Sequence, residues 1–321
     1  MRRLAVQSAL ATSVAAAMGA SLFLAASVVP VVGSIATLLT PLPALRYAVG
    51  RRWWHLRTLS AVALTAVIVG ALAGPVAGVG YLATVGLATV IMSLMLEREK
   101  PFELIVLTAG IALFLSLGAA GLAATGSFAA LSEAVRNTLL QGLERSREFY
   151  RFLGAESALG QHMEANILDV ATELAPALIL ISCCFAVFFN LTLLWRFSQQ
   201  TQLSYALFKD LARWSAPEWM VWVLIAAGFS LFIPFEPIRV LALDVFMCVL
   251  AVYFCQGVAI MAFYFHALGM PALARGIIYL VTGLQPILAA LVCAAGLFDL
   301  WIDFRRLKPP SPEAGSFSGF L

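Results

Sequence analysis

The sequence predicts an all-α integral membrane protein, a polytopic transmembrane helical bundle with eight or nine spans. Three observations predict this class: 62% of the 321 residues are hydrophobic, only 12% are charged, and the apolar residues gather in long runs. A soluble domain of this length needs more charge to cover its surface. We therefore expect a single integral membrane domain over residues 1–321.

Nine apolar segments follow one another along the chain, each close to or longer than the roughly 20 residues that a spanning helix needs. Proline, glycine and charged residues separate them, and the tryptophans fall at or near segment ends, where an amphipathic ring prefers the headgroup region. The segments cover residues 5–27, 31–49, 58–75, 77–96, 102–124, 174–195, 217–235, 238–268 and 273–302.

The stretch 125–173 is different, because it contains seven acidic and four basic residues. Its apolar residues recur at helical spacing from Phe128 to Leu143, which predicts an amphipathic helix outside the membrane core. We expect this helix to lie on the membrane surface or to cap the bundle, with a ligand lid as the alternative. The domain thus divides into an N-terminal five-segment half (1–124), the amphipathic extracytoplasmic segment (125–173), the C-terminal segments (174–304) and a short polar tail (305–321).

Basic residues predict the orientation, because they favour the cytoplasmic side of a membrane. If the first six segments each cross once, one side receives Arg2, Arg3, Arg46, Arg51, Arg52, Arg57, Arg98, Lys100, Arg196, Lys209 and Arg213. The N-terminus is therefore expected in the cytoplasm. Nine single crossings would place Arg305, Arg306 and Lys308 outside, against this rule. Pro286 divides the last segment, so this segment is either one kinked helix or a broken, re-entrant one, and the side of the C-terminus stays open.

Polar side chains inside the apolar segments are the candidates for a ligand site. A charge at the middle of a spanning helix costs about 2.5–3.5 kcal/mol unless it is paired. Such residues either contact a ligand or fix the register of neighbouring helices through hydrogen bonds. The candidates are Asn190, Asp244, Gln256, Gln285 and Asp299.

The stretch GLFDLWIDFRRLKPP at the end of the last segment predicts a helix that stops at the lipid headgroups. Asp303 lies three residues before Arg306 and Trp301 four before Arg305, so an ion pair and a cation–π contact are available at this exit. Asp299 lies one turn deeper and remains a candidate for a polar interior.

Catalytic signatures are absent from the sequence. The three histidines are isolated on different segments, and there is no H-E-x-x-H, P-loop or G-x-S-x-G motif. We therefore expect no enzyme activity, no cofactor and no metal site. The net charge of +3 is spread over short loops without a basic stripe, which argues against a nucleic-acid partner.

Four stretches, in this order, resemble the YybS-like family of bacterial multi-pass membrane proteins. They are VVPVVGSIATLLTPLPALRYAVG near the start, RWSAPEWMVWVL at 213–224, CQGVAIMAFYFHALG at 255–269 and GLFDLWIDFRR at 296–306. The resemblance implies an uncharacterised bacterial inner-membrane protein whose architecture is similar to the S components of energy-coupling-factor transporters. Such components bind a small molecule in a helical bundle and depend on a separate membrane coupling protein and ATPases.

Two functions follow from this sequence. The first is a small-molecule-binding or transport subunit, whose partners are the lipid bilayer, a small-molecule ligand, and a membrane coupling protein or a second copy of the chain. The second is a non-transporting membrane scaffold in cell-envelope assembly or division, whose docking surfaces are the small-residue helix faces and the amphipathic segment. The sequence does not distinguish them.

Overall fold

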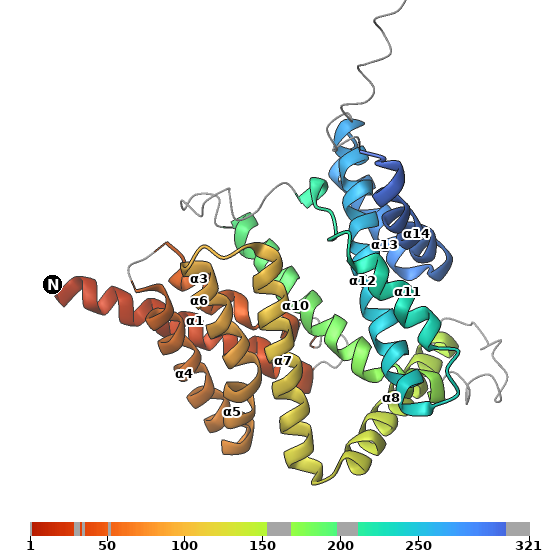
Figure 1. Ribbon diagram of the computed structural model, residues 1–321. Coiled ribbons are helices and arrows are strands. Elements are labelled where there is room, and N and C mark those ends of the chain that lie inside the picture. Colours follow the sequence, from red (N-terminus) through yellow and green to blue (C-terminus); the bar gives the residue numbers. More distant parts are fainter. Residues whose placement is uncertain are drawn as a thin grey trace, which may run out of the picture. The chain divides into compact units, whose positions relative to one another are not determined.

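The computed structural model describes residues 2–28, 33, 36–50, 53–152, 168–197 and 211–305 (Figure 1). All regular secondary structure among these residues is helical, which confirms the predicted class. The helices form two compact units, Met1–Phe208 and Lys209–Leu321. Each unit is described by itself below.

In the N-terminal unit, glycine and proline lie at breaks between successive helices. Gly74 has a φ of 96° and precedes a proline in the first turn of the next helix, which separates two antiparallel apolar helices. Gly126 has a φ of 78° and ends another helix. The helices are α1 (Arg2–Val28), α3 (Pro41–Ala48), α4 (Trp54–Ala73), α5 (Pro75–Tyr81), the π-helix η1 (Leu82–Gly86), α6 (Leu87–Glu97), α7 (Phe102–Thr125), α8 (Phe128–Phe152) and α10 (Ala175–Phe197).

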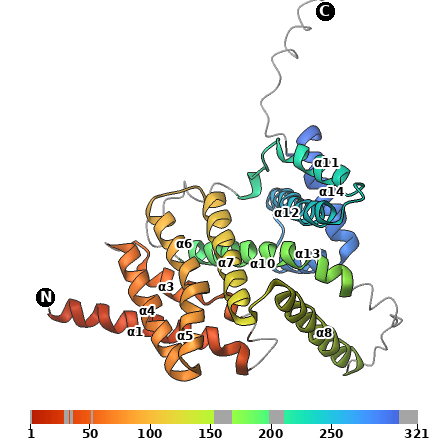
Figure 2. The same cartoon turned by 60° about the horizontal axis from the view of Figure 1, so that its bottom comes forward.

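Small residues allow the helices of this unit to approach closely. Gly70 and Gly78 face each other across the turn at Gly74, and a Cβ on Gly78 would lie 2.7 Å from the carbonyl oxygen of Ala66. Helix α10 packs against α7 and α3 (Figure 2), so the contacts of this helix place it in the N-terminal unit.

Helix α8 confirms the helix predicted in the amphipathic segment. Ser127 begins it, and its hydroxyl accepts a hydrogen bond from the Ala130 N–H at 3.2 Å. The apolar stripe of Leu131, Val135, Leu139 and Leu143 is only half-buried, and no side chain described between 128 and 144 is fully buried.

The C-terminal unit contains a short 3₁₀ turn η2 (Leu211–Arg213) and four helices: α11 (Met220–Ser230), α12 (Glu236–Ala267), α13 (Ala272–Leu284) and α14 (Pro286–Ile302). Its small apolar core joins Ala216 and Leu224 to Val249 and Tyr253 of α12. Helix α11 runs antiparallel to α12, because Ala216 lies beside Gln256 and Gly228 beside Phe246.

Helices α12 and α14 run in the same direction. The Cys293 thiol donates a hydrogen bond to the Leu250 carbonyl at 3.3 Å, and further along both helices Gln256 lies beside Asp299. Between these contacts the two backbones touch: a Cβ on Gly296 would overlap the carbonyl oxygen of Tyr253, and one on Gly257 would overlap that of Val292. Only glycine allows two helices to approach this closely.

Length and composition allow five of the described helices to cross a membrane, or six if the bent pair α13–α14 counts as one span. These five, Trp54–Ala73, Pro75–Glu97 (α5, η1 and α6 together), Phe102–Thr125, Ala175–Phe197 and Glu236–Ala267, begin and end within four residues of the expected segments, but the count of eight or nine spans is not confirmed. The reason is that α3 has only eight residues and α11 only eleven, which is less than a bilayer core requires of a helix, and that the apolar part of α1, Ala9–Ala25, is also too short to count as a span. Helices α13 and α14 are bent by 102° at Gln285, so this segment is broken rather than merely kinked.

Replacing Gly296 with alanine should lower the stability of the protein, because the added Cβ meets a backbone atom that moves only if α12 and α14 separate. Overpacking of this kind typically costs about 1–3 kcal/mol of unfolding free energy. Gly283→Ala in α13 is the matched control: no atom lies within 4 Å of its Cβ, so stability should stay equal or rise. Thermal unfolding in detergent measures the stability of both variants, and equal unfolding temperatures for the two would contradict this packing.

Candidate functional site

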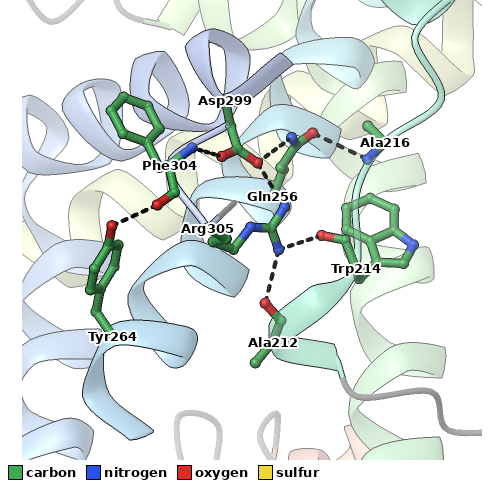
Figure 3. A network of polar contacts seen from close by, with 8 residues as sticks. All are labelled: Ala212, Trp214, Ala216, Gln256, Tyr264, Asp299, Phe304 and Arg305. Carbon is green, nitrogen blue, oxygen red and sulfur yellow. Dashed lines mark hydrogen bonds and ion pairs between the residues drawn. The ribbon is translucent and has the colours of Figure 1, made fainter. Parts of the chain in front are cut away.

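The structure brings two of the five sequence candidates together. Gln256 of α12 and Asp299 of α14 lie in the C-terminal unit, joined by a hydrogen bond of 3.1 Å from the Gln256 amide nitrogen to the carboxylate (Figure 3). The exposed fractions of these residues are only 2% and 6%. They form the centre of a buried polar network.

Asp299 accepts hydrogen bonds at both carboxylate oxygens. Oδ2 accepts from Gln256 and, at 2.7 Å, from the Arg305 guanidinium, which forms a buried ion pair. Oδ1 accepts from the backbone N–H of Phe304 at 2.9 Å. Hydrogen bonds to a charged group are stronger than those between neutral groups. These three bonds therefore offset the free energy that the carboxylate loses when it is removed from water.

A reversal of the chain after α14 brings Arg305 back to Asp299. Asp303 adopts a left-handed conformation with a φ of 47° and ends the helix. The Tyr264 hydroxyl then donates to the Phe304 carbonyl at 2.8 Å and fixes the reversed segment to α12. Arg305 therefore points toward the helices and away from water.

Arg305 also binds the segment that precedes α11. Its Nη1 donates to the carbonyl oxygens of Ala212 and Trp214, both at 2.8 Å. The Oε1 of Gln256 accepts from the Ala216 N–H at 3.1 Å. The network thus links α12, the end of α14 and residues 212–216, as Figure 3 shows.

Two buried polar groups of this unit have no hydrogen-bond partner among the described residues. They are the Nε of Arg305 and the hydroxyl of Tyr253. Tyr253 lies one turn before Gln256 on α12, and its ring packs in the same core as Ala216. Because Nε can only donate, the network keeps the capacity to bind one more acceptor atom.

Asn190 lies in the other unit and is fully buried on α10. Its amide nitrogen donates to the Leu38 carbonyl at 2.6 Å and to the Ala186 carbonyl at 2.8 Å, so it fixes α10 to the residues before α3. Its Oδ1 has no partner among the residues that the structure describes.

Asp244 and Gln285 do not join the network. Asp244 is half-buried three turns before Gln256 on α12, and Gln285 is exposed at the break between α13 and α14. Among the described residues, no group of three His, Cys, Asp or Glu side chains is placed to hold a metal ion.

Sequence reasoning missed Arg305 as the partner of Asp299. The arginine was expected near Trp301 at a membrane exit, but it is 4% exposed whereas Trp301 is 62% exposed. The expected pair of Asp303 with Arg306 involves a residue outside the described ranges. Helical spacing favours pairs three or four residues apart, so the Asp299–Arg305 pair becomes available only through the reversal at Asp303.

Replacing Arg305 with alanine should destabilise the protein by about 3–5 kcal/mol, because Asp299 would stay buried without its counter-charge. The double variant Asp299→Leu with Arg305→Met should lose less stability than Arg305→Ala, since no charge is left unpaired. Arg239→Ala is the control, because its ion pair with Glu236 is exposed and should contribute about 1 kcal/mol or less. Thermal unfolding in detergent checks all three, and equal losses for the two arginines would contradict the network's role.

Comparison with known proteins identifies one family, which is described only as predicted membrane proteins. The family model "Predicted membrane protein (DUF2232)" matches residues 17–300. No curated protein and no solved structure matches the chain. Since the match extends over most of the sequence and includes Gln256 and Asp299, the protein belongs to the DUF2232 family of predicted membrane proteins.

Proposed function

We propose that this protein is a small-molecule-binding or transport subunit and that the network of Gln256, Asp299 and Arg305 is its ligand site. The observation that carries the proposal is the ion pair, 2.7 Å long, whose two side chains are both buried. Ionisable residues within membrane helices are rare and usually belong to a substrate or ion pathway. The proposal gives the protein no catalytic step.

Stability alone is a poor explanation for such an ion pair. Replacing a buried pair by apolar residues of similar volume is often neutral or stabilising, because removing two charges from water offsets their attraction. The ligand hypothesis gives Asp299 and Arg305 a further role. It also accounts for the unpartnered Arg305 Nε, which would donate to an acceptor atom of the ligand.

The charge balance of the network favours an uncharged ligand group. Asp299 and Arg305 neutralise each other, and Gln256 carries no charge. A second anion near Arg305 would face the Asp299 carboxylate across a short distance in a medium of low dielectric constant. We therefore infer that a carbonyl oxygen or a ring nitrogen occupies this position.

The cellular setting belongs to the same proposal. The distribution of arginine and lysine supports a multi-pass protein of the bacterial inner membrane with a cytoplasmic N-terminus. The resemblance to YybS-like proteins and to transporter S components supports binding of a small molecule. The sequence has no ATP-binding motif, so energy would come from a membrane coupling protein or an ion gradient. The other protein partner in the proposal is a second copy of the chain.

Mass spectrometry on protein purified gently from its own membranes tests the site. We expect a retained small molecule in the wild type and its loss in Gln256→Ala, which leaves the Asp299–Arg305 ion pair in place. Gln285→Ala is the matched control: this glutamine is exposed outside the network and the variant should keep the molecule. Thermal unfolding must show that both variants are folded. Retention by folded Gln256→Ala, or no small molecule in the wild type, would reject the site.

One observation favours a second function, that of a scaffold in cell-envelope assembly or division. The apolar stripe of α8 is only half-buried, and Phe128 at its start is 78% exposed. A stripe of this kind suits either the lipid surface or the apolar face of a partner helix.

A photo-crosslinking amino acid at Leu139, on the stripe of α8, separates these two surroundings in cells. A scaffold should give a discrete protein adduct from this position and none from Asn137, which is exposed on the polar side of the helix. Lipid adducts alone at Leu139 would contradict a docking role and support a helix that lies on the membrane.

A further inference from the structure

We propose that α13 and α14 form a re-entrant pair, which enters the membrane on the side where α12 ends and returns to that same side. The Asp299–Arg305 network lies at the returning end, so it opens toward the cytoplasm. This inference rests on the proposed orientation and adds the side from which a ligand reaches the proposed site.

The first argument is the common direction of α12 and α14. Contacts between the two helices advance together along both: Leu250 with Cys293, Tyr253 with Gly296, and Gln256 with Asp299. Two helices that pack side by side and run in the same direction end on the same side of the membrane. The ends of α12 at Ala267 and of α14 at Ile302 are therefore on one side.

The second argument is the length and angle of α13. Its 13 residues extend about 20 Å at 1.5 Å per residue, whereas the hydrocarbon core is about 30 Å thick. The bend of 102° at Gln285 excludes a straight rod made of both helices. A short helix that turns sharply into a longer one leads the chain into the membrane and back.

The third argument is the distribution of charge. Arg196, Lys209 and Arg213 are expected in the cytoplasm. Ala216, three residues after Arg213, lies beside Gln256 in the second half of α12, so the end of α12 lies toward the cytoplasm. A re-entrant pair adds no net crossing, so the cytoplasm also receives Arg275, Arg305, Arg306 and Lys308. This removes the conflict that nine single crossings create.

The arrangement determines the access to the site. Asp299 lies three residues before the end of α14, and residues 212–216, which close the network, follow the cytoplasmic bases of the preceding connection. A ligand would therefore reach Asp299 from the cytoplasmic end. The break at Gln285 lies at the opposite end of α14 and is not part of this entrance.

Cysteine labelling in intact cells with a membrane-impermeant maleimide tests the proposal. The five native cysteines are replaced by serine, and single cysteines are placed at Leu268, exposed just after α12, and at Ser311, beyond α14. Asn137→Cys on α8 is the control expected outside. Since the serine background can fail to fold, alkaline phosphatase and fluorescent-protein fusions to the C-terminus of the native chain provide a second measurement.

We expect Leu268→Cys and Ser311→Cys to be labelled only after permeabilisation, Asn137→Cys to be labelled in intact cells, and only the fluorescent fusion to be active. Opposite sides for positions 268 and 311 would overturn the re-entrant pair and make α13–α14 a single bent span. Labelling of both in intact cells would keep the pair but overturn its cytoplasmic placement. Neither outcome depends on a bound small molecule. The re-entrant pair can therefore be rejected without rejecting the ligand hypothesis, and the ligand hypothesis without rejecting the re-entrant pair.

Discussion

The backbone contact between α12 and α14 at Gly257 and Gly296 is the constraint on which the C-terminal unit depends. Neither position has room for a Cβ, because each faces a carbonyl oxygen of the other helix. Close approach of this kind gains van der Waals contact along the whole interface, which is the main attraction between helices in lipid. It also fixes the register, so that Gln256 meets Asp299. In this view the polar network follows from the backbone packing.

The two units satisfy their buried polar groups in different ways. Among the described residues of the N-terminal unit, the buried polar side chains are hydroxyls and the amide of Asn190. Most of these hydroxyls donate to a carbonyl three or four residues earlier in the chain, as Thr65 does to the Ala61 carbonyl, and two bonds also join helices: Thr65 with the Ala16 carbonyl and Thr58 with Ser93. The C-terminal unit instead buries a full ion pair, whose bonds run between separate segments. Any movement of residues 212–216 therefore acts directly on the charges.

Neutrality explains how this ion pair is tolerated in an apolar setting. An isolated buried charge is expensive, but Asp299 accepts three N–H groups and Arg305 reaches two backbone carbonyls besides the carboxylate. The group as a whole carries no net charge. A ligand of the proposed site would have to replace hydrogen bonds of similar strength, which would favour selective over general binding.

The sequence by itself determined the membrane class, the positions of the apolar helices and the amphipathic helix α8, because these depend on local hydropathy and on helical periodicity. It also placed Gln256 and Asp299 among the polar candidates, since a polar residue within an apolar run is visible without any structure. Only the tertiary structure decided which candidates meet, that Arg305 turns back at Asp303, and that α12 and α14 run in the same direction. These features depend on one left-handed residue and on a contact between two glycines far apart in the sequence, and neither leaves a periodic signal along the chain.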